Sequence, residues 1–241
     1  MLPEDIDSKT GDTVKEVLES KHPKLRVPDI SFMEKYDTLP DSVEIDITAD
    51  TVESMARRLI GSAGPGGTDT SDLQHWLLRF GGASVEFRKA VAEFVRWKSN
   101  NDPPWAAYRA LRAGRRAVLD KRHSVCPVGI GESLERRLGA KCVLLVCGDE
   151  AKEVFGVDQL CAGLEAGMEG GIHAAKLLWQ EHALAEEWKF RLVDGKNAFN
   201  EDSRILTLST ICHEWPPGSR YFLSVTSTSP FWCFAQAVTC F

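Results

Sequence analysis

The residue best suited to chemistry in this sequence is Asp194, which follows a short apolar run. The Phe-Arg-Leu-Val sequence at 190–193 predicts a buried strand that ends at this carboxylate. Residues 195–197 favour a turn, and a helix can begin at about residue 198. A buried carboxylate is costly unless it is paired, and a metal ion at a strand end is one such partner. The alternative is that Asp194 caps the helix that follows it.

A second candidate is a basic hairpin in the middle of the chain. Residues 115–119 and 125–130 predict two short strands that are joined by a charged turn. Lys121 and Arg122 lie at its tip, where positive charge could close on a triphosphate and stabilise the departing pyrophosphate. The alternative is an ordinary exposed hairpin tip, in which these side chains only interact with water.

Helices are expected to position both candidates. Apolar periodicity predicts helices at about 14–20, 51–60 and 73–80. A further helix is expected, which Ser84 can cap and which residues 100–104 break. A loop with four glycines and a proline, residues 61–69, separates two of them. We expect a capping box of Asp50 with Glu53 at the start of the second helix. The third helix should carry an apolar side, formed by Leu73, Trp76, Leu77 and Phe80. A later helix should carry Ile172, Ala175, Leu178 and Trp179 on one face.

The charge is unevenly distributed along the 241 residues. The net charge is −6, but residues 1–55 hold 6 Lys and Arg against 14 Asp and Glu, whereas residues 88–141 hold 13 against 5. A local basic surface, rather than the total charge, decides whether polyphosphate binds, so residues 88–141 could face nucleic acid or a triphosphate. The alternative is a set of solvated amphipathic helices.

The cysteines and the N-terminal sequence indicate the cellular compartment and the kinds of site to expect. Seven cysteines without a CxxC pair support neither a zinc site nor a disulfide framework, which is typical of a reducing compartment. The acidic N-terminal sequence has no apolar core, so no secretory signal is expected. We therefore expect an intracellular location, in the cytoplasm or the nucleus.

The spacing around Asp194, Phe-x-x-x-Asp-x-x-x-Ala-Phe, resembles the first carboxylate motif of reverse transcriptases. The resemblance implies that Asp194 and the carbonyl group of Gly195 hold Mg²⁺ for nucleotidyl transfer, and that Phe199 screens the sugar 2′ position. It also implies RNA or DNA primer-template and deoxynucleotides as partners. Two Mg²⁺ ions serve such chemistry, because the attacking and the leaving oxygen both gather charge.

Three more segments resemble this family, in the family's order over about residues 50–210. Lys121 followed by Cys-Pro-Val-Gly-Ile-Gly-Glu at 126–132 is similar to the fingers of non-LTR retroelement enzymes, although Cys126 replaces the family's arginine and supplies neither its charge nor its donors. The loop 61–69 resembles the glycine-rich opening of these domains. Residues 157–178 resemble the glycine-rich segment before the long palm helix. The implied fold is α+β, mostly helical, with incomplete reverse-transcriptase-like fingers and a partial palm.

The family's aromatic-x-Asp-Asp hairpin is absent, since the sequence contains no Asp-Asp pair. Asp194 with one backbone carbonyl cannot hold two metal ions tightly, so we predict no polymerase activity from this chain alone. We expect a flexible acidic leader at 1–45, the fingers and palm fragment at 46–212, and a truncated or aberrant uncharged tail at 213–241. The tail is near the length of a membrane span, but its Ser and Thr content argues against insertion.

Two hypotheses follow from these observations. The first is a fragment of a retroelement reverse transcriptase, an RNA-directed DNA polymerase that binds primer-template. The second is a non-catalytic helical module that binds nucleic acid or protein through residues 88–141.

Overall fold

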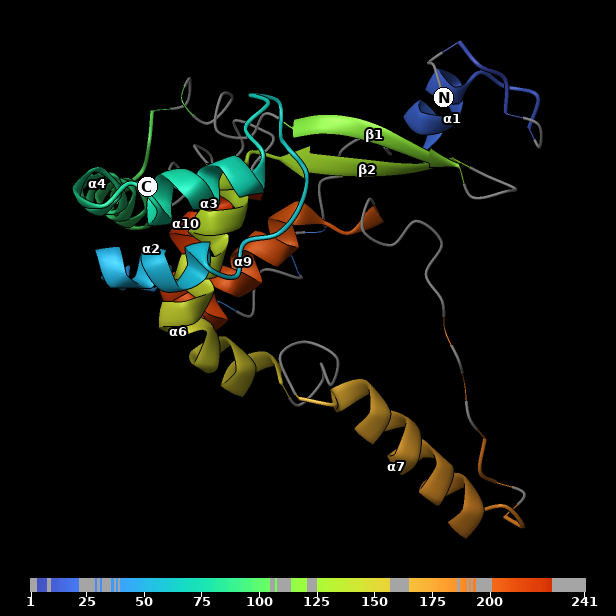
Figure 1. Cartoon of the computed structure of the whole chain (residues 1–241). Coiled ribbons are helices and arrows are strands. Elements are labelled where there is room, and N and C mark those ends of the chain that lie inside the picture. Colours follow the sequence, from blue (N-terminus) through green and yellow to red (C-terminus); the bar gives the residue numbers. More distant parts are fainter. Residues whose placement is uncertain are drawn as a thin grey trace.

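The structure is a computed structural model in which most of the chain is described. The described residues are 4–7, 10–21, 29, 31, 36, 38, 40–104, 107, 114–120, 125–156, 165–185, 187–189, 191, 193 and 201–226. Within them the chain is mostly helical, and its one sheet has two strands. The predicted mostly helical chain with a hairpin is therefore confirmed. Figure 1 shows a body of packed helices from which the hairpin and one helix extend.

The helix predicted near the N-terminus is present as α1 (Val14–Ser20). Thr13 and Glu16 form a capping box, in which each side chain binds the backbone N–H of the other residue. This arrangement satisfies two of the amide groups that the first turn leaves without partners. The helix lies beside the far end of the hairpin (Figure 1) and contacts β2.

The first helix of the body is α2 (Ala49–Ala56), which begins and ends earlier than the predicted 51–60. Its N-cap is Thr48, whose hydroxyl accepts a hydrogen bond from Thr51 N at 3.2 Å. The predicted capping box of Asp50 with Glu53 is therefore wrong. Thr48 and Asp50 both carry side chains that can cap a helix, and Thr48 is the N-cap because it lies in extended backbone before the first turn.

Helices α3 (Thr70–Leu78) and α4 (Gly82–Asn100) follow, joined by a tight connection. Leu73 and Leu77 are buried, but Trp76 and Phe80 are 45% and 60% exposed, so the apolar side predicted for this helix is buried only in part. Ser84 does not cap α4, because the helix begins earlier, with Gly81 as its N-cap. Its hydroxyl accepts from Phe80 N at 2.8 Å and donates to Trp76 O at 2.7 Å, which ties the end of α3 to α4.

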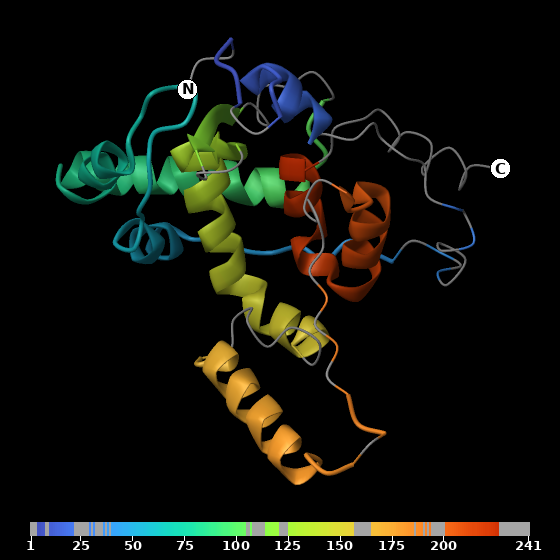
Figure 2. The same ribbon diagram turned by 90° about the vertical axis from the view of Figure 1, so that its right-hand side faces the viewer.

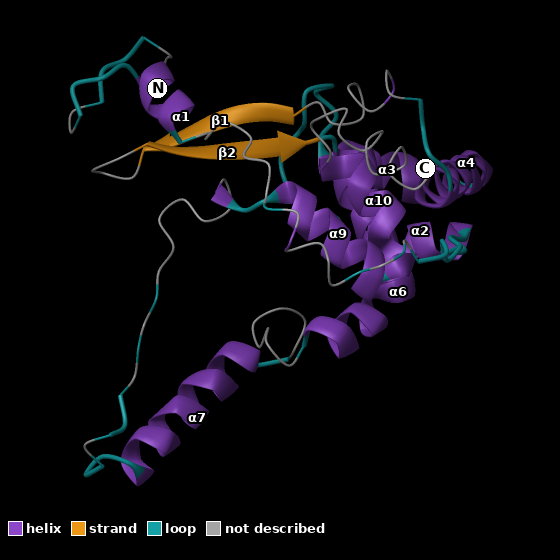
Figure 3. Ribbon diagram, turned by 180° about the vertical axis from the view of Figure 1, so that it is seen from behind, coloured by secondary structure: helices purple, strands orange, loops and turns teal. Residues whose placement is uncertain are grey.

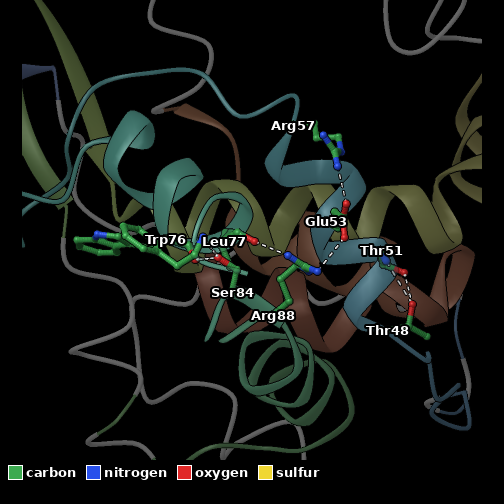
Figure 4. A network of polar contacts seen from close by, with 9 residues as sticks. Thr48, Thr51, Glu53, Arg57, Trp76, Leu77, Ser84 and Arg88 are labelled. Atoms are coloured by element: carbon green, nitrogen blue, oxygen red, sulfur yellow. Dashed lines mark hydrogen bonds and ion pairs between the residues drawn. The ribbon is translucent and has the colours of Figure 1, made fainter. Parts of the chain in front are cut away.

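A polar network joins α2, α3 and α4 (Figure 4). The Arg88 guanidinium, on α4, donates to Leu77 O at 2.5 Å and pairs with Glu53 at 3.0 Å. Glu53 also pairs with Arg57 at 2.6 Å. Because the Arg88 side chain is only 13% exposed, it links the end of α3 to α2 across the surface of the core.

The predicted hairpin is confirmed as β1 (Gly114–Asp120) and β2 (Val125–Gly131). The strands are antiparallel, with Gly114 opposite Gly131 and Asp120 opposite Val125. Figure 3 shows the hairpin extending from the helical body as a two-stranded arm. The structure describes only the backbone for 115–120 and 125–127, and residues 121–124 lie outside the described residues.

The chain returns from the hairpin to the body through a π-helix, η2 (Ser133–Leu138), which continues into α6 (Gly139–Phe155). Cys147 has non-helical dihedral angles (φ −126°, ψ 16°) and marks a kink in α6. Its carbonyl group accepts a hydrogen bond from the Trp215 indole at 3.0 Å. A kink needs such an outside donor, since it breaks the regular hydrogen-bond ladder of the helix.

Two further helices complete the body, α9 (Arg204–Glu214) and α10 (Pro216–Thr226). Helix α9 begins at Arg204, where the Ser203 side chain caps it. The helix expected to start near residue 198 would begin outside the described residues, and Glu201, which is described, is helical. Helix α10 contacts α4, α6 and α9. The common core is formed by buried residues of α2, α3, α4, η2, α6, α9 and α10: Val52, Met55, Leu73, Leu77, Val91, Val95, Leu138, Cys142, Val143, Ile211 and Tyr221.

Helix α7 (Gly167–Glu181) is the element that extends from the body (Figures 1 and 2). The predicted helix is confirmed, but none of its residues is buried. The apolar face of this helix therefore lies at the surface.

The buried strand predicted before Asp194 is not observed at the positions that the structure describes. Arg191 and Val193 have no strand assignment, and Val193 is 78% exposed. A strand needs a neighbour to satisfy its backbone groups, and the only strands that pair in the described part of the chain are β1 and β2.

Candidate nucleic-acid interface

The residues predicted to carry nucleotide chemistry all lie outside the described residues. Asp194, Gly195 and Phe199 belong to the undescribed range 194–200, and Lys121 and Arg122 to the range 121–124. Their positions relative to one another are therefore left as predictions. The structure does describe where the hairpin starts from the body, and several polar and charged residues meet there.

The base of the hairpin rests on the glycine-rich loop 61–69. Gly66 N donates a hydrogen bond to the carboxylate of Glu132, the first residue after β2. Ser133 Oγ donates to Thr68 O at 3.1 Å. A Cβ atom added at Gly64 would lie 2.7 Å from Gly131 O, so only glycine allows this approach of two backbones. Two segments that are about 65 residues apart in the sequence thus form one joint.

The π-helix η2 places two arginines beside this joint. Arg136 Nη2 donates to Val225 O at 2.9 Å, which links the π-helix to the end of α10. The Arg137 guanidinium lies against Gly61, where any side chain on residue 61 would displace it. Arg137 Nη1 is buried and has no hydrogen-bond partner among the described residues. Single turns of π-helix are rare in proteins, and those that occur are often found at functional sites.

A buried ion pair lies on the inner side of η2. Lys98 Nζ contacts Glu135 Oε1, and their side chains are 1% and 7% exposed. The Tyr221 ring covers the ammonium group at 4.5 Å, and the Tyr221 hydroxyl donates to Glu135 O at 2.6 Å. Glu135 Oε2 is buried without a hydrogen-bond partner in the described part of the chain. The pair fixes η2 to α4 and α10 in the core.

Burial changes the acid-base properties of this cluster. Desolvation lowers the pKa of Lys98 to about 7, and the Arg136 guanidinium acts in the same direction. The Glu135 carboxylate opposes this shift, because it favours the ammonium form. Desolvation also raises the pKa of the Tyr221 hydroxyl, so this group stays protonated and acts as a donor. The same effect raises the pKa of the Cys142 thiol to about 12.

The sequence analysis missed Lys98 and Glu135, although their positions carry a signal. Lys98 follows Val91 by seven residues and Val95 by three, so it falls on the buried stripe of α4. Glu135 is three residues before Leu138, which is also buried. Charges of opposite sign on two apolar stripes are a pattern that predicts a buried pair.

The described residues contain neither a metal site nor a membrane span. In that part of the chain, no three His, Cys, Asp or Glu side chains converge so that they could hold a metal ion. No helix described there is long and apolar enough to cross a membrane. Comparison with known proteins finds no match for this chain among protein families, curated proteins or solved structures.

Proposed function

We propose that this chain is the fingers and the first part of the palm of a non-LTR retroelement reverse transcriptase, and that alone it binds primer-template without extending it. The observation that carries the proposal is the joint between loop 61–69 and residues 131–133. Both segments resemble the family, and they are in direct contact. A chance resemblance in two distant segments gives no reason for them to meet in space.

The basic residues near this joint supply a reason for binding. The hairpin carries Arg115 and Arg116 in β1, and Arg136 and Arg137 follow β2 directly. Lys and Arg side chains bind nucleic acid mainly by neutralising phosphates and releasing counterions. The affinity of such a surface falls steeply with salt concentration and depends little on base sequence.

Nucleotidyl transfer needs more than this chain offers. Mg²⁺ requires near-ideal octahedral coordination by oxygen atoms and usually several carboxylate or phosphate ligands. In the proposal, Asp194 and the carbonyl group of Gly195 are the ligands, and Phe199 contacts the sugar. Without an Asp-Asp pair we expect only weak Mg²⁺ binding and no primer extension.

Primer extension on an RNA template with Mg²⁺ tests the catalytic part. The purified chain and its Asp194→Ala variant are compared, and we expect no product from either. Extension that disappears in the variant would show that other carboxylates complete the metal site, and would refute the predicted inactivity.

Salt-dependent binding of a labelled RNA–DNA primer-template tests the binding part. The double variant Lys121→Ala/Arg122→Ala removes two charges at the hairpin tip, and Lys189→Ala/Arg191→Ala removes the same charge elsewhere. We expect the first to reduce the slope of log K against log salt by about 1.4–1.8, at roughly 0.7–0.9 per phosphate contact, and the second to leave it unchanged.

The alternative, a non-catalytic module that binds through residues 88–141, predicts a different pattern. Single-stranded RNA would bind as tightly as primer-template, with no effect of Mg²⁺ or of Asp194→Ala. Equal loss of affinity in both double variants would instead indicate attraction to the overall charge, and would refute a defined interface at the hairpin.

A further inference from the structure

Helix α7 carries an apolar face that the helical body leaves exposed. Met168, Ile172 and Trp179 are 60%, 62% and 55% exposed, and Ala175 completes the row. Their spacing of four, three and four residues places them on one stripe of the helix, in the pattern of the seam between two packed helices. Exposed apolar rows of this kind mark interaction surfaces rather than solvated helices.

Charged residues line one edge of this stripe. Glu169 and Lys176 lie next to it on the same side, and they are seven residues apart. The rise of an α-helix separates them by about 10 Å, which is too far for them to pair with each other. Neither has an ion-pair partner among the residues that the structure describes.

We propose that α7 pairs with α7 of a second copy of this chain, antiparallel, to form a symmetric dimer. In this arrangement Ile172 packs beside Ala175 of the other copy, and Met168 beside Trp179. The same register places Glu169 of each copy beside Lys176 of the other, which forms two equivalent ion pairs. In a parallel pair, Glu169 would lie level with Glu169 of the other copy and Lys176 level with Lys176, so neither ion pair would form.

The second copy is the occupant that these charges favour, because one helix then supplies both halves of a self-complementary edge. A two-fold interface requires that residue i contacts residue j and that j contacts i, and Glu169 with Lys176 meets this condition.

The size of the face limits the strength of the dimer. A helix of 15 residues is roughly 22 Å long, so the contact is near the lower limit of about 1,000 Å² for specific interfaces. We therefore expect a dissociation constant of roughly 10 μM, which makes the dimer dependent on protein concentration. The surface lies outside residues 88–141, so the dimer does not depend on nucleic-acid binding.

Sedimentation velocity of the full chain, without nucleic acid, tests the apolar seam. Ile172→Asp places a charge in the seam, whereas Leu177→Asp places the same charge on the other side of the helix, at a residue that is 65% exposed. We expect a concentration-dependent dimer in the native chain and in Leu177→Asp, and a monomer in Ile172→Asp. Circular dichroism of each variant checks that its helices are retained.

Charge reversal tests the antiparallel register. Glu169→Lys and Lys176→Glu each turn two attractive contacts into repulsive ones, so each should weaken the dimer about tenfold. A mixture of the two variants should restore it, since every pair is then again of opposite sign. A non-specific apolar association would show no such recovery.

Three outcomes would overturn the proposal. The native chain could stay monomeric at concentrations about tenfold above the expected constant. The two aspartate variants could behave alike. Finally, a monomeric chain whose thermal stability falls with Ile172→Asp and not with Leu177→Asp would show that another segment of the same chain covers this face.

Discussion

The buried pair of Lys98 and Glu135 makes a strong prediction about stability. Replacing Lys98 by methionine keeps the unbranched side chain and removes the ammonium group. The Glu135 carboxylate, which is 7% exposed, then loses its partner. Its second oxygen already lacks a hydrogen-bond partner among the described residues, so the carboxylate is left buried with little compensation.

The expected cost of Lys98→Met is about 3–5 kcal/mol, because an uncompensated charge is left in the core. For a chain of this size each 1 kcal/mol changes the melting temperature by about 2–4 °C, so we expect a decrease of roughly 6–20 °C. The double variant Lys98→Met/Glu135→Leu removes both charges and should fall within about 1 kcal/mol of the native stability. The two substitutions are therefore expected to be strongly non-additive.

Urea unfolding of the native chain, the two single variants and the double variant measures this coupling. Lys89→Met is the matched control on the same helix, because Lys89 pairs with Glu86 at 2.8 Å with both side chains exposed. Exposed pairs contribute less than about 1 kcal/mol. The reasoning would be refuted if Lys98→Met were as mild as Lys89→Met, or if the double variant lost the sum of the single losses.

Two other substitutions test the joint and the core. Gly64→Ala should destabilise the chain by about 1–3 kcal/mol, because its Cβ would lie 2.7 Å from backbone atoms of Gly131 and Glu132. Gly82→Ala is the control and should be neutral or stabilising, because the space around residue 82 is open. Urea unfolding measures both, and equal losses of stability would contradict the close approach at Gly64. Burial raises the pKa of the Cys142 thiol from 9.0 to about 12, because the folded chain holds the thiol in its neutral form. The free energy of unfolding therefore contains a contribution from this thiol that is complete below pH 9 and is lost as the pH rises toward 12. Relative to Cys142→Val, the native chain should lose about 1.4 kcal/mol per pH unit above pH 9, and a constant difference from pH 7 to 11 would refute this assignment.

Local signals in the sequence were sufficient for several elements. The apolar run and turn residues around 115–130 predicted the hairpin, and periodicity predicted α1, α2, α3, α4 and α7. Their ends were less predictable, since Thr48 rather than Asp50 caps α2, and Ser84 binds across to α3 instead of capping α4. Each of these side chains can cap a helix locally. Thr48 does so because it lies in extended backbone before the first turn, whereas the Ser84 hydroxyl is held by backbone groups at the end of α3.

The candidate site, too, was predicted only in part from the sequence. The types and spacing of residues around Asp194 and Lys121 are properties of the sequence, and the hypothesis of a reverse-transcriptase fragment depends on them. The contact of loop 61–69 with the end of β2 could not be read from either segment alone, because glycine is favoured both in free loops and at close backbone contacts.

By itself, the sequence determined several of the helices, the hairpin and where the basic residues gather, because these depend on neighbours along the chain. Only the tertiary structure decided that Lys98 and Glu135 pair inside the core, and that the apolar face of α7 stays exposed. Periodicity shows that a helix has an apolar face, but whether another element covers this face depends on contacts between distant residues. Burial of a charge likewise depends on finding its partner in space, 37 residues away in this chain.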